Sequence, residues 1–168
     1  MDVSIEKAIN RQINNELEAS YTYLAMAAYF DKQNLTGFSA FMERQSNEEL
    51  GHAQRLFRYV LARNGNVELE AINKPQKAYG TVQDAFALSL ERERENTESI
   101  YNLYELTRTK HDYGTLSHLQ WFLDEQVEEE KVMGDILGRL ELAGNDKAAL
   151  LILDDQMARF DPPSPSPK

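Results

Sequence analysis

Acidic and imidazole side chains interrupt the apolar face of a predicted helix in the first half of this chain. Glu49 and His52 are three positions apart, so an α-helix places both on one face, about one turn from each other. Phe38, Met42 and Leu56 continue that face at helical spacing, which indicates that it packs inward. A buried carboxylate beside an imidazole needs a partner, and a metal ion is a suitable one.

Three other amphipathic segments repeat this conflict between an apolar face and polar groups. Glu16 interrupts the first segment and Glu93 the third, while Gln126 and Glu129 interrupt the fourth, again three positions apart. An unpaired buried carboxylate is costly or takes up a proton, and several in one core repel each other unless cations lie between them. The four interruptions therefore predict one buried metal site.

The order of these residues nearly repeats along the chain, which indicates two helical hairpins with pseudo-twofold symmetry. One Glu from each of two helices, with an i,i+3 pair from each of the other two, is the pattern of di-iron carboxylate proteins. Gln126 and Glu129 depart from it because they replace a Glu and a His, so we expect fewer or weaker ligands at the second metal position. Carboxylates with one imidazole suit iron but also accept zinc or manganese, so ligand type leaves the metal open.

Composition limits the class of protein. A length of 168 residues with 42% hydrophobic residues predicts one domain. The lack of cysteine excludes disulfides, thiolate zinc sites, iron–sulfur clusters and a cysteine nucleophile. A net charge of -10 argues against nucleic-acid binding. The amino terminus lacks signal-peptide features and no stretch approaches a membrane span, so we expect a cytoplasmic protein without membrane contact.

Periodicity and capping residues predict an all-α fold, an antiparallel four-helix bundle. The first hairpin has a helix capped by Ser4 that runs to about residue 33, a turn at residues 34–37, and a helix to about residue 63. Thr81 and Asp84 resemble a capping box that opens a third helix to about residue 110, and a fourth ends near Gly144. Residues 64–80 lack helical periodicity and are long enough to form a crossover between helices 2 and 3.

The carboxyl end predicts a short fifth helix, which begins after Asp146 and carries apolar residues as far as Phe160. We expect residues 1–160 to form the domain. Residues 161–168, rich in proline and serine, are expected to form a flexible tail.

Four motifs resemble those of the bacterial non-haem ferritins, within the ferritin-like di-iron carboxylate superfamily. They are Asn-Asn-Glu-Leu-Glu at 14–18, Glu-Glu-Leu-Gly-His at 48–52, Leu-Gln-Trp-Phe at 119–122 and Glu-Gln-Val-Glu-Glu-Glu-Lys at 125–131. The resemblance covers all of the chain except the proline-rich tail. It implies that the metal is iron.

The resemblance also implies a role for each predicted ligand. Glu16, Glu49 and His52 would hold one iron, designated iron A. Glu49 would bridge to a second iron, iron B, which Glu93 and Glu129 would complete.

A third iron site is implied on the inner surface of a shell of roughly 24 subunits. Its ligands would be Glu48, Glu125 and Glu128, with Glu129 shared between this site and iron B. Trp121 would lie close by.

The implied reaction is the oxidation of two Fe(II) by O2 or H2O2, followed by deposition of ferric oxide mineral inside the shell. Gln126 would lie near iron B and Tyr23 would stand beside the centre as an electron donor. The resemblance therefore implies an iron-storage protein with ferroxidase activity, a homo-oligomer without haem.

Several residues also have a purely structural interpretation. Glu48 and Glu128 could be solvated helix faces, and Tyr23 and Trp121 ordinary core aromatics. Four glutamates that fall off the apolar stripes are expected on the surface: Glu18, Glu91, Glu95 and Glu98.

Three rival functions remain as alternatives. A haem-containing bacterioferritin would place methionine after the bridging glutamate, where this chain has Leu50, and would keep a Glu and a His in the second pair. A DNA-protecting mini-ferritin has iron sites between subunits and lacks the fifth helix. A non-catalytic helical bundle would retain the glutamates only as a charge network.

Overall fold

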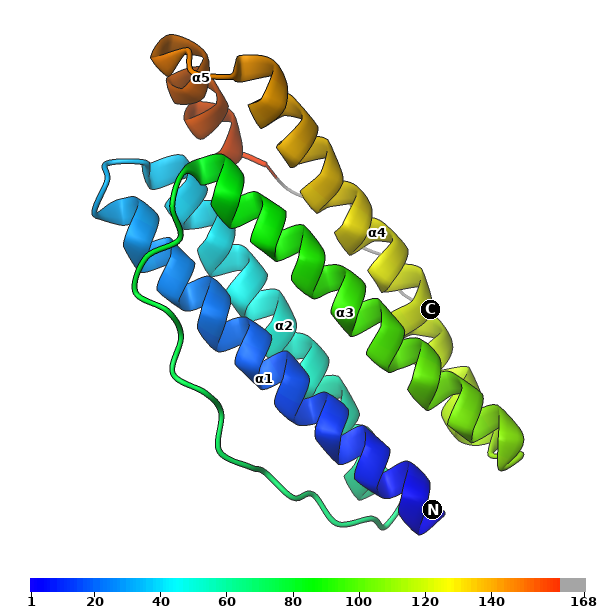
Figure 1. The fold of residues 1–168 in the computed structure, drawn as a ribbon. Helices are drawn as coiled ribbons and strands as arrows, with labels where there is room; N and C mark the ends of the chain where they lie inside the picture. The colour runs from blue at the N-terminus through cyan, green and yellow to red at the C-terminus, as the bar shows by residue number, and fades with distance from the viewer. Residues whose placement is uncertain (161–168) are drawn as a thin grey trace.

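The computed structural model describes residues 1–160 and forms five helices, with no strand in that range (Figure 1). The expected all-α fold is confirmed. The segment predicted to be a flexible tail, residues 161–168, lies outside the described residues, and the predicted domain extent stays a prediction. The helices are α1 (Val3–Asp31), α2 (Thr36–Ala62), α3 (Val82–Thr109), α4 (Tyr113–Ala143) and α5 (Lys147–Met157).

Two antiparallel hairpins, α1 with α2 and α3 with α4, lie side by side as a four-helix bundle (Figure 1). The segment between α2 and α3 runs along the outside of the bundle from one end to the other, as the expected crossover does. Because α3 starts at the end where α2 starts, these two helices are parallel.

Capping residues explain where two of the helices begin. Thr81 and Asp84 form the predicted capping box at the start of α3, each side chain accepting from the other residue's backbone N–H. The expected cap at Ser4 is wrong. Asp2, one position before the helix, is the N-cap of α1: its carboxylate accepts from the Ser4 N–H at 2.8 Å and so satisfies a free N–H group of the first turn.

Helix α5 packs across one end of the bundle against α2 (Figure 1). Asp154 accepts from the Phe38 N–H at 2.8 Å, and Arg44 donates to the Met157 carbonyl at 2.6 Å. A Cβ at Gly37 would lie 1.7 Å from the Asp154 carbonyl oxygen, so this close approach requires glycine.

The buried apolar side chains form two clusters at opposite ends of the bundle. One lies towards α5 and includes Phe30, Phe38 and Phe86, and the other includes Ile13 and Leu119. On each long helix, the residues of one cluster are separated from those of the other by a gap of about three turns or fewer. The predicted polar interruptions fall in these gaps.

Candidate metal centre

The polar interruptions of all four long helices meet in the layer between the two apolar clusters. Each of these side chains belongs to a residue that is at most 4% exposed. They are Glu16 on α1, Glu49 and His52 on α2, Glu93 on α3, and Gln126 and Glu129 on α4.

The α1/α2 half of the centre is arranged for a cation. Glu16, Glu49 and His52 each present a ligand atom within 4.8 Å of the others. The Nδ1 of His52 lies 3.1 Å from Oε2 of Glu49, whereas Oε1 of Glu49 is buried without a hydrogen-bond partner. One oxygen of Glu49 thus faces the imidazole and the other has no protein donor, with the Glu16 carboxylate close by, an arrangement that fits a metal ion that would join all three residues.

The α3/α4 half is satisfied by neutral donors instead. Glu93 accepts a short hydrogen bond from the Tyr23 hydroxyl and a long one, 3.5 Å, from the Gln126 amide. Glu129 accepts from the Gln45 amide at 3.0 Å. Among residues 1–160, two groups of ligand atoms converge, the α1/α2 group above and a second group described below, and Glu93 belongs to neither. The two halves therefore differ in how their carboxyl groups are hydrogen-bonded, and the weaker second metal position stays a prediction.

Burial changes the protonation of these carboxyl groups. It raises the pKa of Glu93 to about 7 and the pKa of Glu49 and Glu129 well above the usual range, and neighbouring carboxylates add to the effect on Glu49 and Glu129. Burial likewise raises the pKa of the Tyr23 hydroxyl, and the charge of Glu93 adds to this. Without cations, protons must offset the repulsion in this layer, and bound metal would replace them.

A second group of converging ligands adjoins the first. Glu48, His52, Glu125 and Glu129 present atoms within 4.8 Å of one another. The Nε2 of His52 is 4.0 Å from Oε1 of Glu125, and the other oxygen of Glu125 is buried without a partner. Burial raises the pKa of Glu125 to about 7. His52 thus faces both groups, one with each ring nitrogen.

Glu128, which the family resemblance assigns to the third site, is not a member of this group. Its charge contributes to the raised pKa of Glu125, so it lies in the neighbourhood. Trp121 packs edge-on against His52 with ring centroids 5.3 Å apart, and the guanidinium of Arg55 lies 4.2 Å from the Trp121 ring centroid.

The profile of the ferritin family, described as the ferritin-like domain, matches residues 6–143. The chain belongs to the ferritin family. It is 38% identical over 151 residues to a bacterial non-heme ferritin of Staphylococcus aureus, an alignment that covers 90% of this chain and 91% of the relative. A bacterial non-heme ferritin of Staphylococcus epidermidis matches at the same identity and coverage.

Solved structures agree with this membership. An open-pore ferritin from the hyperthermophilic archaeon Archaeoglobus fulgidus superposes on this ferritin chain with a TM-score of 0.94 at 40% identity, over 96% of this chain and 99% of that one. A form of the Archaeoglobus fulgidus ferritin engineered to be closed matches with the same TM-score. Within residues 1–160, no helix of this ferritin chain has the length and apolar character needed to cross a bilayer.

Sequence reasoning missed the amide side chains that support the carboxylates of this ferritin centre. Gln12 donates to Glu16 at 2.7 Å, and Asn96 donates to the same carboxylate at 3.3 Å. Together with Gln45 on Glu129, these amides hold ligands in place without bringing a competing positive charge. Gln12 and Gln45 were detectable, since each lies four positions before a predicted ligand of its own helix.

Proposed function

We propose that this chain is the subunit of an iron-storing ferritin with ferroxidase activity. The observation that supports this best is that ligand atoms of Glu16, Glu49 and His52 lie within 4.8 Å of one another, while one buried oxygen of Glu49 has no protein donor. Fe(II) is the substrate, and two Fe(II) ions supply two electrons. O2 with two protons would give H2O2, and H2O2 with two protons would give two waters.

Each residue has a proposed role in that reaction. Glu16 and His52 hold the first iron, and Glu49 lies between the two iron positions. Glu93 and Glu129 hold the second iron once they exchange their hydrogen bonds for the metal, since both accept from protein donors. Gln126 keeps the second position weaker than a carboxylate would.

Tyr23 is positioned for the electron-donor role that the family resemblance implies. Its hydroxyl donates directly to the carboxylate of Glu93, and the residue is fully buried. An electron from this phenol would have to cross only one hydrogen bond to reach a ligand of the second iron.

The decisive experiment adds Fe(II) to the metal-free protein without oxygen, then admits O2 and follows near-ultraviolet absorbance of a diferric product. We expect the fast phase to saturate near two irons per subunit. The variant Glu91→Gln, at an exposed position on α3, is the matched control and should behave as wild type. Absence of a fast phase in the wild-type protein would favour the non-catalytic bundle.

The second group of ligands is proposed to receive iron after the first oxidation. Glu48 and Glu125 converge there with His52 and Glu129, and Glu128 lies near Glu125. Replacement of Glu48 and Glu128 by Ala should change iron uptake beyond two per subunit and leave the first oxidation largely intact. Equal loss of both phases would place these residues in the primary centre or in folding.

A closed shell of about 24 subunits in the cytoplasm is part of the proposal. Apolar side chains that a shell could cover are exposed on α1 and α5, including Leu24, Leu151 and Ile152. Light scattering should find the assembled particle, and a stable monomer or 12-subunit particle at neutral pH would contradict it.

The bacterioferritin alternative is tested by spectroscopy. Leu50 occupies the position at which a bacterioferritin has its haem-ligating methionine, and a leucine side chain cannot coordinate haem iron. Protein from an iron- and haem-replete host should therefore show no Soret band.

A further inference from the structure

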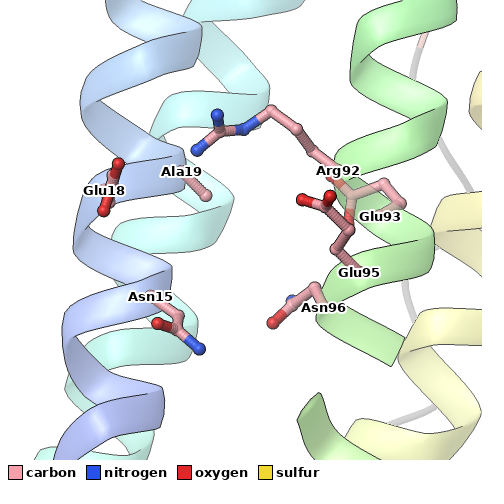
Figure 2. Close-up of a pocket in the computed structure, with 7 residues that line it drawn as sticks. All are labelled: Asn15, Glu18, Ala19, Arg92, Glu93, Glu95 and Asn96. Carbon is pink, nitrogen blue, oxygen red and sulfur yellow. The ribbon is translucent and has the colours of Figure 1, made fainter. Parts of the chain in front are cut away.

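A pocket opens between α1 and α3, on the side of the bundle where the two hairpins meet (Figure 2). Its volume is about 260 Å³, and its polar lining consists of Asn15, Glu18, Arg92, Glu93, Glu95 and Asn96. A water takes up about 30 Å³ in the liquid, so the pocket can hold a divalent ion with its first hydration shell.

The inner wall of this pocket is made by residues of the metal centre. Glu93, a proposed iron ligand that is 2% exposed, lines it directly. Asn96 also lines it and donates to Glu16 at 3.3 Å and to the Gln126 amide oxygen at 3.5 Å. The pocket is therefore bounded by one proposed ligand of the α3/α4 half and by an amide that contacts the ligand of α1.

The outer part of the pocket carries opposing charges. Glu18 and Glu95 supply carboxylates from the two helices, and Asn15 faces Asn96 across the opening (Figure 2). Arg92 reaches from α3 across the opening towards α1 (Figure 2). Its guanidinium takes part in none of the ion pairs or hydrogen bonds of residues 1–160, so it can move without breaking one.

These carboxylates are not arranged to retain an ion. Neither Glu18 nor Glu95 belongs to a group of converging ligands among the described residues. A place that attracts cations but does not coordinate them with several atoms suits passage better than storage.

We propose that this pocket is the route by which hydrated Fe(II) reaches the centre, with Glu18 and Glu95 attracting the ion, Glu93 receiving it and Arg92 opposing its passage. The inference rests on the proposed function and adds the route of its substrate. Carboxylates in a cleft with low-dielectric walls raise the local concentration of a cation, and a nearby guanidinium lowers it. Removal of the carboxylates should therefore lower the rate of Fe(II) access, and removal of the guanidinium should raise it.

A competing route exists on the α2/α4 side. A larger and shallower depression of about 670 Å³ there is lined by Glu48, Arg55, His118 and Glu125, among others. It leads to the second group of ligands, so it suits transfer of iron between that group and the centre. Gly51, at its edge, leaves open space for a larger side chain.

The charge test measures diferric formation by stopped flow in air over a range of Fe(II) concentrations, in the assembled protein. Access limits the rate at low Fe(II) and chemistry limits it at saturation. The double variant Glu18→Gln/Glu95→Gln should lower the second-order rate at low Fe(II) by roughly 3- to 10-fold and leave the saturating rate unchanged. Arg92→Gln should raise the low-Fe(II) rate, and added salt should reduce both differences.

The steric test fills each opening in turn. Ala19 lines the α1/α3 pocket, so Ala19→Leu should lower the low-Fe(II) rate, whereas Ala87→Leu, at an exposed α3 position outside it, should not. Gly51→Phe narrows the α2/α4 depression and should leave this rate unchanged. Light scattering and the melting temperature would verify that each variant is assembled and folded.

Three results would overturn the route. The first is that all pocket variants have the wild-type rate at low Fe(II). The second is that the carboxylate variants lower the saturating rate as much as the rate at low Fe(II). The third is that Gly51→Phe slows the reaction and Ala19→Leu does not. Failure of the proposed function is recognised separately, because the wild-type protein would then form no diferric product at any Fe(II) concentration.

Discussion

The two hairpins contribute equivalent positions to one centre, yet their carboxyl groups differ in hydrogen bonding. In the α1/α2 hairpin, Glu49 keeps a buried oxygen without a donor. In the α3/α4 hairpin, Glu93 and Glu129 each accept hydrogen bonds from neutral side chains. A carboxyl oxygen without a protein donor can take up a cation once the proton of the group is displaced, whereas a hydrogen-bonded one must also give up its donors. The difference therefore lies at Glu49, which has an oxygen open to an arriving ion, whereas Glu93, Glu129 and also Glu16, which accepts from Gln12 and Asn96, must exchange partners.

Loss of Glu49, the proposed shared ligand, should have the largest effect. Glu49→Gln removes the carboxylate that we propose to lie between the two iron positions, so binding at both positions should weaken by on the order of 100-fold or more. Anaerobic Fe(II) titration would measure the binding, and initial oxidation rates would fall with it. Retention of one tight site would show that Glu49 serves a single half.

Loss of Glu93 should affect the two iron positions differently. Glu93→Gln should keep the first iron bound, weaken the second position and slow oxidation by on the order of 10- to 100-fold. Glu91→Gln, two positions away and exposed, should do almost nothing. Initial rates at two Fe(II) per subunit compare the two variants, and a slow Glu91 variant beside a normal Glu93 variant would contradict the assignment.

Stability against pH should reveal the strain of the metal-free centre. Burial raises the pKa of Glu93 from 4.5 to about 7, so the folded protein holds this proton more tightly than the unfolded chain does. The contribution of Glu93 to stability is complete below about pH 4.5 and is lost as the pH rises through about 7. Metal-free Glu93→Gln should therefore melt roughly 3–6 °C above wild type at pH 8 and near it at pH 4.5.

Calorimetry of the metal-free proteins checks this difference. The same comparison with a divalent ion bound is the control, because the ion offsets the repulsion in wild type and should reverse the order. A Glu93→Gln variant less stable than wild type at pH 8 would mean that the hydrogen bond from Tyr23 outweighs the repulsion.

The smallest effect is expected far from the centre, where Asp112 joins the hairpins. Its carboxylate pairs with Arg63, the residue that follows α2, 3.1 Å from each of two guanidinium nitrogens, and accepts from the Thr115 N–H as the cap of α4. Asp112→Asn should cost about 1 kcal/mol and leave oxidation unchanged.

This cost should depend on pH in the opposite sense to that of Glu93. Partial burial raises the pKa of Asp112, but hydrogen bonds from Arg63 and Thr115 outweigh it and lower the pKa overall. The contribution of Asp112 is therefore present above about pH 3.8 and is lost as the pH falls further. Urea unfolding at pH 7 and pH 3 would measure the difference.

Local periodicity was sufficient to place most of the predicted residues. Glu16, Glu49 and Glu93 each interrupt an apolar stripe of their own helix, and each is buried as that pattern predicts. The crossover and the capping box of α3 were predictable for the same reason, because turn and cap preferences act over a few residues. The cap of α1 was misplaced because Asp2 and Ser4 are both good caps two positions apart.

The sequence by itself determined the number of helices, the inward face of each and the carboxylates that those faces bury. Only the tertiary structure decided which groups meet across helices. It places His52 against two groups of ligands and the Asn96 amide on the carboxylate of Glu16. It also places Glu18 and Glu95, which were expected to be ordinary surface residues, in the lining of a pocket beside Glu93. The reason is physical. Periodicity within a helix fixes direction, but contacts between residues some 80 positions apart depend on the rotation and spacing of packed helices.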